Sequence, residues 1–131
     1  MTRAEFNAFC AALPGSSHVV QWGGADVWKL GGKVFAICGW GEDGRDAFTF
    51  KVTKLGFEVL TGMPGLRPAP YLASRGLSWA QQHGDPGLPD AELCRHLRAS
   101  YDMIAAALPR KTRASLGLEP GKQATPPETR D

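Results

Sequence analysis

The sequence has little of three features that would each assign a protein to a special class. It has three cysteines, Cys10, Cys38 and Cys94, an odd number at wide spacing, so we expect no disulfide framework. It has no run of about eighteen apolar residues, so we expect no membrane span. Its formal net charge is only +2, which is too small to indicate a nucleic-acid partner by itself.

What is present is the composition of an ordinary globular protein. The chain has 131 residues, of which 43% are hydrophobic and 21% charged, values typical of one soluble domain. Its first ten residues, MTRAEFNAFC, have a helical pattern and lack the apolar stretch of a secretory signal. Together with cysteines that lie among apolar neighbours, this predicts a cytoplasmic location.

Local patterns predict three helices. Thr2 and Glu5 have the spacing of a capping box, and an apolar stripe from Phe6 to Leu13 follows at helical spacing. Thr53 precedes a short helix within residues 53–61. Asp90 is the expected N-cap of the longest helix, which continues to about residue 108.

Five strands are predicted, at about residues 18–22, 25–30, 33–40, 46–52 and 77–82. The first four are too close together for crossover helices, so they should form an antiparallel meander. If Gly31 and Gly32 form a two-residue turn, Leu30 pairs with Lys33, Lys29 with Val34, and Trp28 with Phe35.

The order of these elements predicts a two-layer α+β fold. An antiparallel sheet of about five strands should carry helices on one face, and its other face should be open to solvent or to a partner. We expect a single domain over residues 1–118. Residues 119–131 are polar, rich in proline and without periodicity, so we predict that this tail is disordered.

The glycine-rich segment at residues 39–44 matches the pattern GxGxxG but does not predict a nucleotide site. A dinucleotide site requires a helix next, whereas the following residues alternate like a strand, and Glu42 and Asp43 would repel a phosphate. We expect no metal and no cofactor, since Cys94 and His96 point to different helix faces. His83 and Asp85 are the most suitable candidates for a catalytic base and its orienting acid, but their neighbours favour a turn. An uncharacterised hydrolase or transferase is therefore kept only as an alternative.

Several short motifs occur in an order that resembles the MmcQ/YjbR family. The resemblance covers about residues 1–116. It rests on Leu13-Pro14-Gly15, Val27-Trp28-Lys29, Gly32-Lys33-Val34-Phe35-Ala36, Phe50-Lys51-Val52, Arg67-Pro68-Ala69-Pro70-Tyr71-Leu72 and Leu88-Pro89-Asp90. The chain departs from the family where relatives commonly have His-Trp, because it reads Ser74-Arg75-Gly76-Leu77-Ser78-Trp79 here. The resemblance implies a compact α+β domain. It also implies DNA binding, through likeness of the fold to a double-wing DNA-binding motif.

Two functions follow as hypotheses. The first is a non-enzymatic DNA-binding protein that contacts phosphates from a basic sheet face and its hairpins. Its candidate residues are Lys29, Lys33, Arg45, Lys51, Arg67 and Arg75. The alternative is a domain that uses the open sheet face to bind a small ligand, another protein or a second copy of itself, without nucleic acid. The tryptophans are expected to pack in the core, but any that face outward would form a stacking surface.

Overall fold

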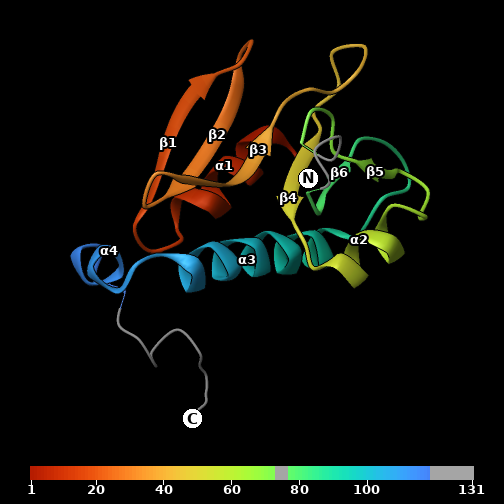
Figure 1. Cartoon of the computed structure of the whole chain (residues 1–131). Coiled ribbons are helices and arrows are strands. Elements are labelled where there is room, and N and C mark those ends of the chain that lie inside the picture. The colour runs from red at the N-terminus through yellow and green to blue at the C-terminus, as the bar shows by residue number, and fades with distance from the viewer. Residues whose placement is uncertain (73–76, 119–131) are drawn as a thin grey trace.

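A computed structural model of the chain describes residues 1–72 and 77–118, and the predicted disorder of residues 119–131 lies outside them. Helices pack on one side of a six-stranded antiparallel sheet, an α+β fold as predicted (Figure 1). In chain order the elements are α1 (Arg3–Ala11), β1 (Ser16–Gln21), β2 (Ala25–Leu30), β3 (Lys33–Cys38), β4 (Phe48–Lys51), α2 (Lys54–Leu60), β5 (Leu66–Pro68), β6 (Trp79–Gln82), α3 (Asp90–Ala107) and α4 (Arg110–Ser115).

The helices begin close to where the sequence predicts. The capping box before α1 is present: the Glu5 amide donates to the Thr2 hydroxyl at 3.1 Å, and the Thr2 amide donates to the Glu5 carboxylate at 2.8 Å. The predicted N-cap of α3 is wrong by one residue. Pro89 is the N-cap, because its extended backbone (ψ 150°) ends the preceding loop, and Asp90 is the first helical residue.

The predicted meander is confirmed, and the sheet order is β1-β2-β3-β4-β6-β5. Leu30 pairs with Lys33 and Lys29 with Val34, as expected from a two-residue turn. The predicted pairing of Trp28 with Phe35 is wrong, because Trp28 pairs with Ala36. A bulge shifts the register between Trp28 and Lys29, and such a bulge opposes two residues of one strand to one of the other.

The sheet has one strand more than predicted. β5 pairs with β6, matching Arg67 with Gln81. At three residues including Pro68, β5 is too short to show an alternating pattern, which explains why the sequence did not predict it as a strand. Proline is tolerated here because β5 lies at the edge of the sheet.

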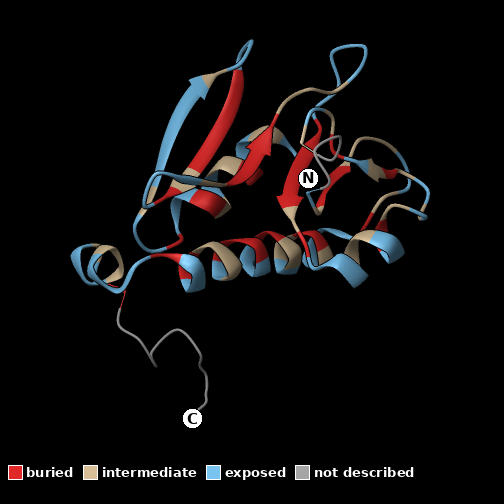
Figure 2. Ribbon diagram, viewed as in Figure 1, coloured by how far each residue is buried: buried red, intermediate tan, exposed pale blue. Residues whose placement is uncertain are grey.

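The main core lies between the sheet and the helices. Figure 2 shows β2, β3 and β4 buried, and α3 buried along the side that meets the sheet, whereas β1 is exposed. Phe6 of α1 and Leu97 of α3 meet Phe35 and Phe50 of the sheet in this core, and all four are fully buried. Ser100 links the layers, since its hydroxyl donates to the Phe35 carbonyl and accepts from the Lys51 amide.

The opposite face is less open than predicted. Thr49 and Gln81 point away from the helices, yet both are 0% exposed. A second, smaller cluster lies on this side: Trp40 and Leu72 pack against Ala25, Val27 and Ile37. Loops that follow β3 and β5 therefore cover part of the face. The side of the sheet away from the helices is called the open face, although loops cover part of it.

Candidate functional site

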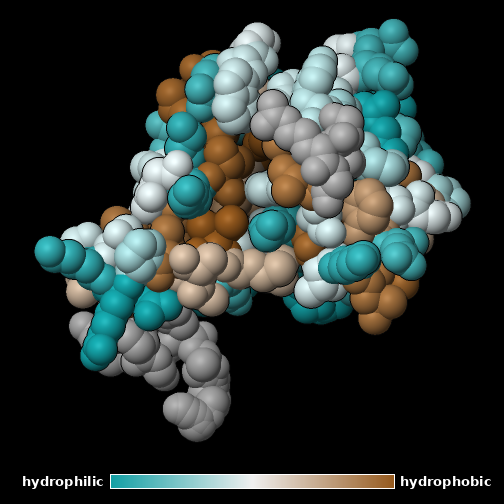
Figure 3. Space-filling model, in the orientation of Figure 1, coloured by the Kyte–Doolittle hydropathy of each residue, from teal (hydrophilic) through white to brown (hydrophobic). Residues whose placement is uncertain are grey.

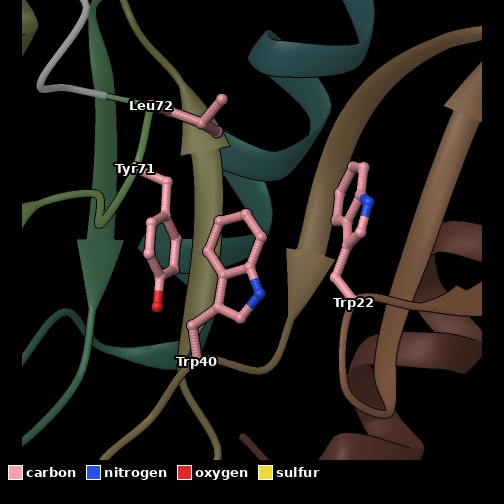
Figure 4. A pocket seen from close by; sticks show the side chains of 4 residues that line it. All are labelled: Trp22, Trp40, Tyr71 and Leu72. Carbon is pink, nitrogen blue, oxygen red and sulfur yellow. The ribbon is translucent and has the colours of Figure 1, made fainter.

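A pocket of about 500 Å³ lies on the open face, lined by Trp22, Trp40, Tyr71 and Leu72. Each residue comes from a segment that follows a strand: Trp22 directly follows β1, Trp40 follows β3, and Tyr71 and Leu72 follow β5. Figure 4 shows the Trp40 ring standing between Tyr71 on one side and Trp22 on the other. The pocket is thus assembled by the sheet from three separate parts of the chain.

The aromatic rings of the pocket form a continuous row. The Trp22 and Trp40 rings have centroids 5.7 Å apart and are tilted by 34°, so they form a V-shaped slot. Trp40 and Tyr71 meet edge to face at 5.3 Å and 81°. Trp22 is 50% exposed and Tyr71 is 70% exposed. Large aromatic side chains therefore face solvent at a concave site, where they can stack on a ligand.

Beneath the rings the floor of the site is apolar. Trp40 and Leu72 rest on Ala25, Val27 and Ile37, which are at most 2% exposed. Figure 3 shows hydrophobic side chains gathered in a hollow over β2 and β3, with hydrophilic side chains around it. An apolar floor excludes water, which strengthens the contact of any ring that enters.

Three of the four pocket residues have a backbone conformation that side chains disfavour. The φ angle is +53° at Trp22, +62° at Trp40 and +69° at Tyr71. Among the described residues the only other non-glycine residue with a positive φ is Asp43. A side chain in this left-handed region costs about 1–2 kcal/mol relative to glycine, and for bulky residues it is rare. Backbone strain of this kind is concentrated at functional sites, so its occurrence at three pocket residues identifies the pocket as a candidate binding site.

One arginine contacts the backbone of the pocket residue Trp40. Arg67 donates from Nε to the Gln81 side-chain oxygen at 2.8 Å and from Nη2 to the Trp40 carbonyl at 3.3 Å. Gln81 in turn donates to Thr49 Oγ1 at 3.1 Å inside the sheet. Nη1 of Arg67 lies 3.4 Å from the exposed carboxylate of Glu42. The guanidinium is thus held in place from the buried side and meets only a loosely bound acid on the outer side.

A second arginine fixes the two turns that carry the tryptophans. Arg3 of α1 donates from Nη2 to the Gly24 carbonyl at 2.7 Å and to the Cys38 carbonyl at 3.1 Å. Gly24 ends the turn that begins at Trp22, and Cys38 ends β3 just before Trp40. One guanidinium therefore sets the spacing of the segments on both sides of the slot.

Asp26 anchors this arginine. Its carboxylate accepts from Arg3 Nε at 2.6 Å, from Asn7 Nδ2 at 3.3 Å and contacts His18 Nε2 at 2.7 Å. Burial raises the pKa of Asp26, but the hydrogen bonds from Arg3, His18 and Asn7 together outweigh burial and lower its pKa to about 2. The carboxylate therefore stays charged at neutral pH and keeps Arg3 in position.

Comparison with known proteins agrees with this architecture. A model of the YjbR family matches residues 11–103, which is most of the chain. The chain belongs to the YjbR family. Its fold is similar to the crystal structure of the Deinococcus radiodurans protein DR2400, whose domain is named DUF419, with a TM-score of 0.77 and 19% identity over 99% of this chain and 96% of that one. No curated protein matches the chain.

The YjbR domain brings together only some of the six cations that sequence reasoning assigned to DNA. Lys29, Lys51 and Arg67 share the open face: Lys29 pairs with Val34, and Lys51 lies over the Trp79 ring at 5.7 Å. Lys33 and Arg45 do not join them. Lys33 pairs with Leu30, whose side chain is in the core on the helix side, and Arg75 lies outside the described residues.

Arg45 instead borders a small polar pocket of about 190 Å³ in this YjbR protein. Its guanidinium contacts Asp85 at 3.2 Å, and His83, Asp46 and Asp90 also line the pocket. These acids have cationic partners, because Asp46 contacts Arg3 and Asp90 contacts the amine of Met1. The pocket joins His83 and Asp85, but its charges neutralise one another.

Within residues 1–72 and 77–118 of the YjbR chain, no three His, Cys, Asp or Glu side chains are grouped as a metal site requires. In the same part of the chain, no helix has both the length and the apolar character needed to cross a lipid bilayer.

Sequence reasoning missed this pocket of the YjbR fold. Trp22 and Trp40 were expected in the core, with an outward-facing stacking surface as the alternative, and Tyr71 and Leu72 were noted only as part of a family motif. A signal was present in the sequence: Trp22 precedes Gly23-Gly24, and Trp40 stands between Gly39 and Gly41. Large aromatic residues occupy turn positions where glycine is the usual choice, and such a departure suggests a binding role.

Proposed function

We propose that this YjbR protein is a non-enzymatic binding domain that holds the flat ring of a small molecule between Trp22 and Trp40. The left-handed backbone at Trp22, Trp40 and Tyr71 carries the proposal. Glycine adopts this conformation without cost, so turn geometry does not explain aromatic residues there. Burial does not explain Trp22 either, because half of its side chain is exposed. Ligand binding accounts for both observations.

The size and shape of the pocket support a single small molecule. Its volume of about 500 Å³ lies within the range of small-molecule sites, roughly 300–1,000 Å³. The Trp22 and Trp40 rings are spaced as a contacting aromatic pair, with centroids 5.7 Å apart, so a ligand ring enters between them only when one indole moves away from the other. The Trp22 side chain is 50% exposed, and its outer side faces solvent.

Binding of duplex DNA has weaker support from the same residues. Lys29, Lys51 and Arg67 share the open face, as DNA binding requires, but the exposed carboxylate of Glu42 lies 3.4 Å from Arg67 and would repel a phosphate backbone there. Lys33 lies on the helix side of the sheet and Arg45 pairs with Asp85. Two lysines at the far end of β2 and β4 make a sparse phosphate-binding surface compared with an aromatic pocket of this size.

The test is a titration of isotope-labelled protein with naphthalene carboxamide, a neutral flat probe, followed by the NMR signals of the indole N–H groups. We expect the signals of Trp22 and Trp40 to shift in a saturable way, with Kd near the millimolar range for so small a probe. Trp28 is an internal control, because its ring is 7% exposed and its N–H donates to Asn7 at 2.9 Å. Equal shifts at all tryptophans, or no shifts, would overturn the proposal.

DNA binding is tested by fluorescence anisotropy with a labelled duplex at low and at physiological salt. The proposed function predicts no saturable, salt-sensitive binding at micromolar protein. Binding that falls steeply with salt and is lost in the double variant Lys29→Glu/Lys51→Glu would establish the DNA hypothesis in its place.

The proposal requires no catalytic group. His83 and Asp85 do line one pocket, but Asp85 pairs with Arg45 there, and this pocket is separate from the aromatic one. The three cysteines are free thiols, which is compatible with the predicted cytoplasmic location.

A further inference from the structure

We propose that the ligand of the aromatic pocket is a flat aromatic acid, and that Arg67 binds its carboxylate in place of Glu42. This inference rests on the proposed function and names the class of ligand. It starts from the position of Arg67, whose Nη2 donates to the backbone carbonyl of Trp40, one of the residues that line the pocket. A ring that packs against Trp40 and carries an acidic substituent directed at this carbonyl meets the guanidinium.

Arg67 is prepared for an anion by contacts on its buried side. Nε donates to Gln81, which is 0% exposed and is itself tied to Thr49 at 3.1 Å. These contacts hold the planar guanidinium in one orientation, so little further side-chain entropy is lost when an anion binds. With Nε and Nη2 engaged on the protein, Nη1 is the nitrogen that faces Glu42 and that a ligand carboxylate would meet in its place.

The present partner of Arg67 on the outer side is easy to displace. Glu42 contacts Nη1 at 3.4 Å, beyond the usual length of a charge-assisted hydrogen bond, and its side chain is 73% exposed. Ion pairs as exposed as this contribute little to stability. A carboxylate carried by a ligand has its ring held in the pocket, so it competes with Glu42 from a fixed position and at high effective concentration.

The charge and the polarity of the residues around the pocket both favour an aromatic acid as the ligand. The rings and their floor of Ala25, Val27 and Ile37 are apolar and favour a hydrocarbon ring. Among the described residues, Arg67 contacts the pocket residue Trp40, whereas Lys29 pairs with Val34 beside the turn at the other end of β2. In this part of the chain the site thus combines a stacking slot with a neighbouring arginine, which is the chemistry that recognises an aromatic acid.

The experiment compares two probes of the same shape, naphthalene carboxylate and naphthalene carboxamide, by NMR titration of the indole signals at physiological salt. We expect the carboxylate to bind roughly five- to tenfold more tightly than the carboxamide. In Glu42→Gln the affinity for the carboxylate should rise a further roughly twofold or more, with no change for the carboxamide. Glu58→Gln removes the same charge from α2 and is the matched control, since Glu58 is exposed there.

A second variant tests Arg67 directly. Arg67→Gln should lose the preference for the carboxylate while still binding the carboxamide, and circular dichroism checks that it folds. If both probes bind wild type equally and Glu42→Gln changes neither, the role of Arg67 is refuted while the proposed function stands. If neither probe binds, the proposed function fails and this inference fails with it.

Discussion

Trp22 and Trp40 adopt the same left-handed backbone conformation, and their rings are neighbours with centroids 5.7 Å apart. They belong to different turns, which lie at the same end of the sheet because β1, β2 and β3 are neighbours in an antiparallel meander. Arg3 holds both turns through the carbonyls of Gly24 and Cys38. The slot between the two indoles is therefore a consequence of the sheet topology and of the contacts of one partly exposed arginine.

Replacing Trp22 by glycine should separate stability from binding. Glycine relieves the strain of φ +53°, and the ring that is lost is 50% exposed, so we expect the free energy of unfolding to stay within about 1 kcal/mol of wild type or to rise. Binding of naphthalene carboxamide should fall below detection. Urea unfolding and the NMR titration measure the two effects.

Trp28→Gly is the matched control for this variant. Its ring is 7% exposed and packs in the main core, so the same replacement should cost about 3–5 kcal/mol. If Trp22→Gly lost a comparable amount of stability, the Trp22 ring would be a structural element and the argument from strain would fail.

The charge of Asp26 should stabilise the fold at neutral pH and cease to do so in acid. Its pKa is lowered from 3.8 to about 2 in the folded protein, so its contribution is fully present above pH 3.8 and is lost as the pH falls towards 2. The shift corresponds to about 2 kcal/mol. Urea unfolding of wild type and Asp26→Asn should show a stability difference that shrinks across this window, whereas a difference independent of pH would contradict the assignment.

Ser100 should be essential to the contact between α3 and the sheet. Its buried hydroxyl serves both the Phe35 carbonyl and the Lys51 amide, so Ser100→Ala leaves two backbone groups without this partner. We expect a loss of about 1–3 kcal/mol in urea unfolding. Ser115→Ala is the control, because that hydroxyl bonds only within the exposed helix α4, and an equal loss in both variants would refute the bridging role.

The three thiols should differ in reactivity. Burial raises the pKa of Cys10 strongly and that of Cys38 to about 12, so neither is a thiolate near neutral pH. Cys94 is partly exposed, although burial raises its pKa too. Alkylation of the native protein at pH 8, followed by mass spectrometry, should modify Cys94 first and the other two only after unfolding. Early modification of Cys10 would show that the core opens locally.

Much of the fold is encoded in local patterns. The Thr2–Glu5 capping box and the apolar stripe after it specify α1, because capping and helical spacing involve residues a few positions apart. Gly31-Gly32 specifies the β2–β3 turn in the same way. Close spacing of the strands was enough to predict the antiparallel meander, since no crossover connection fits.

The binding site depends on information that is not local. Alternation along β4 predicts that its residues lie on two faces of the sheet. It does not predict that Thr49 is buried, because the Gln81 side chain and the loops after β3 and β5 that cover this face come from distant parts of the chain. The bulge that moves Trp28 opposite Ala36 follows no pattern that alternation reveals. The sequence by itself determined helices α1, α2 and α3, the meander and the family. The tertiary structure decided that Trp22, Trp40 and Tyr71 meet, because their contact requires the order β1-β2-β3-β4-β6-β5 and the packing of three turns on one sheet.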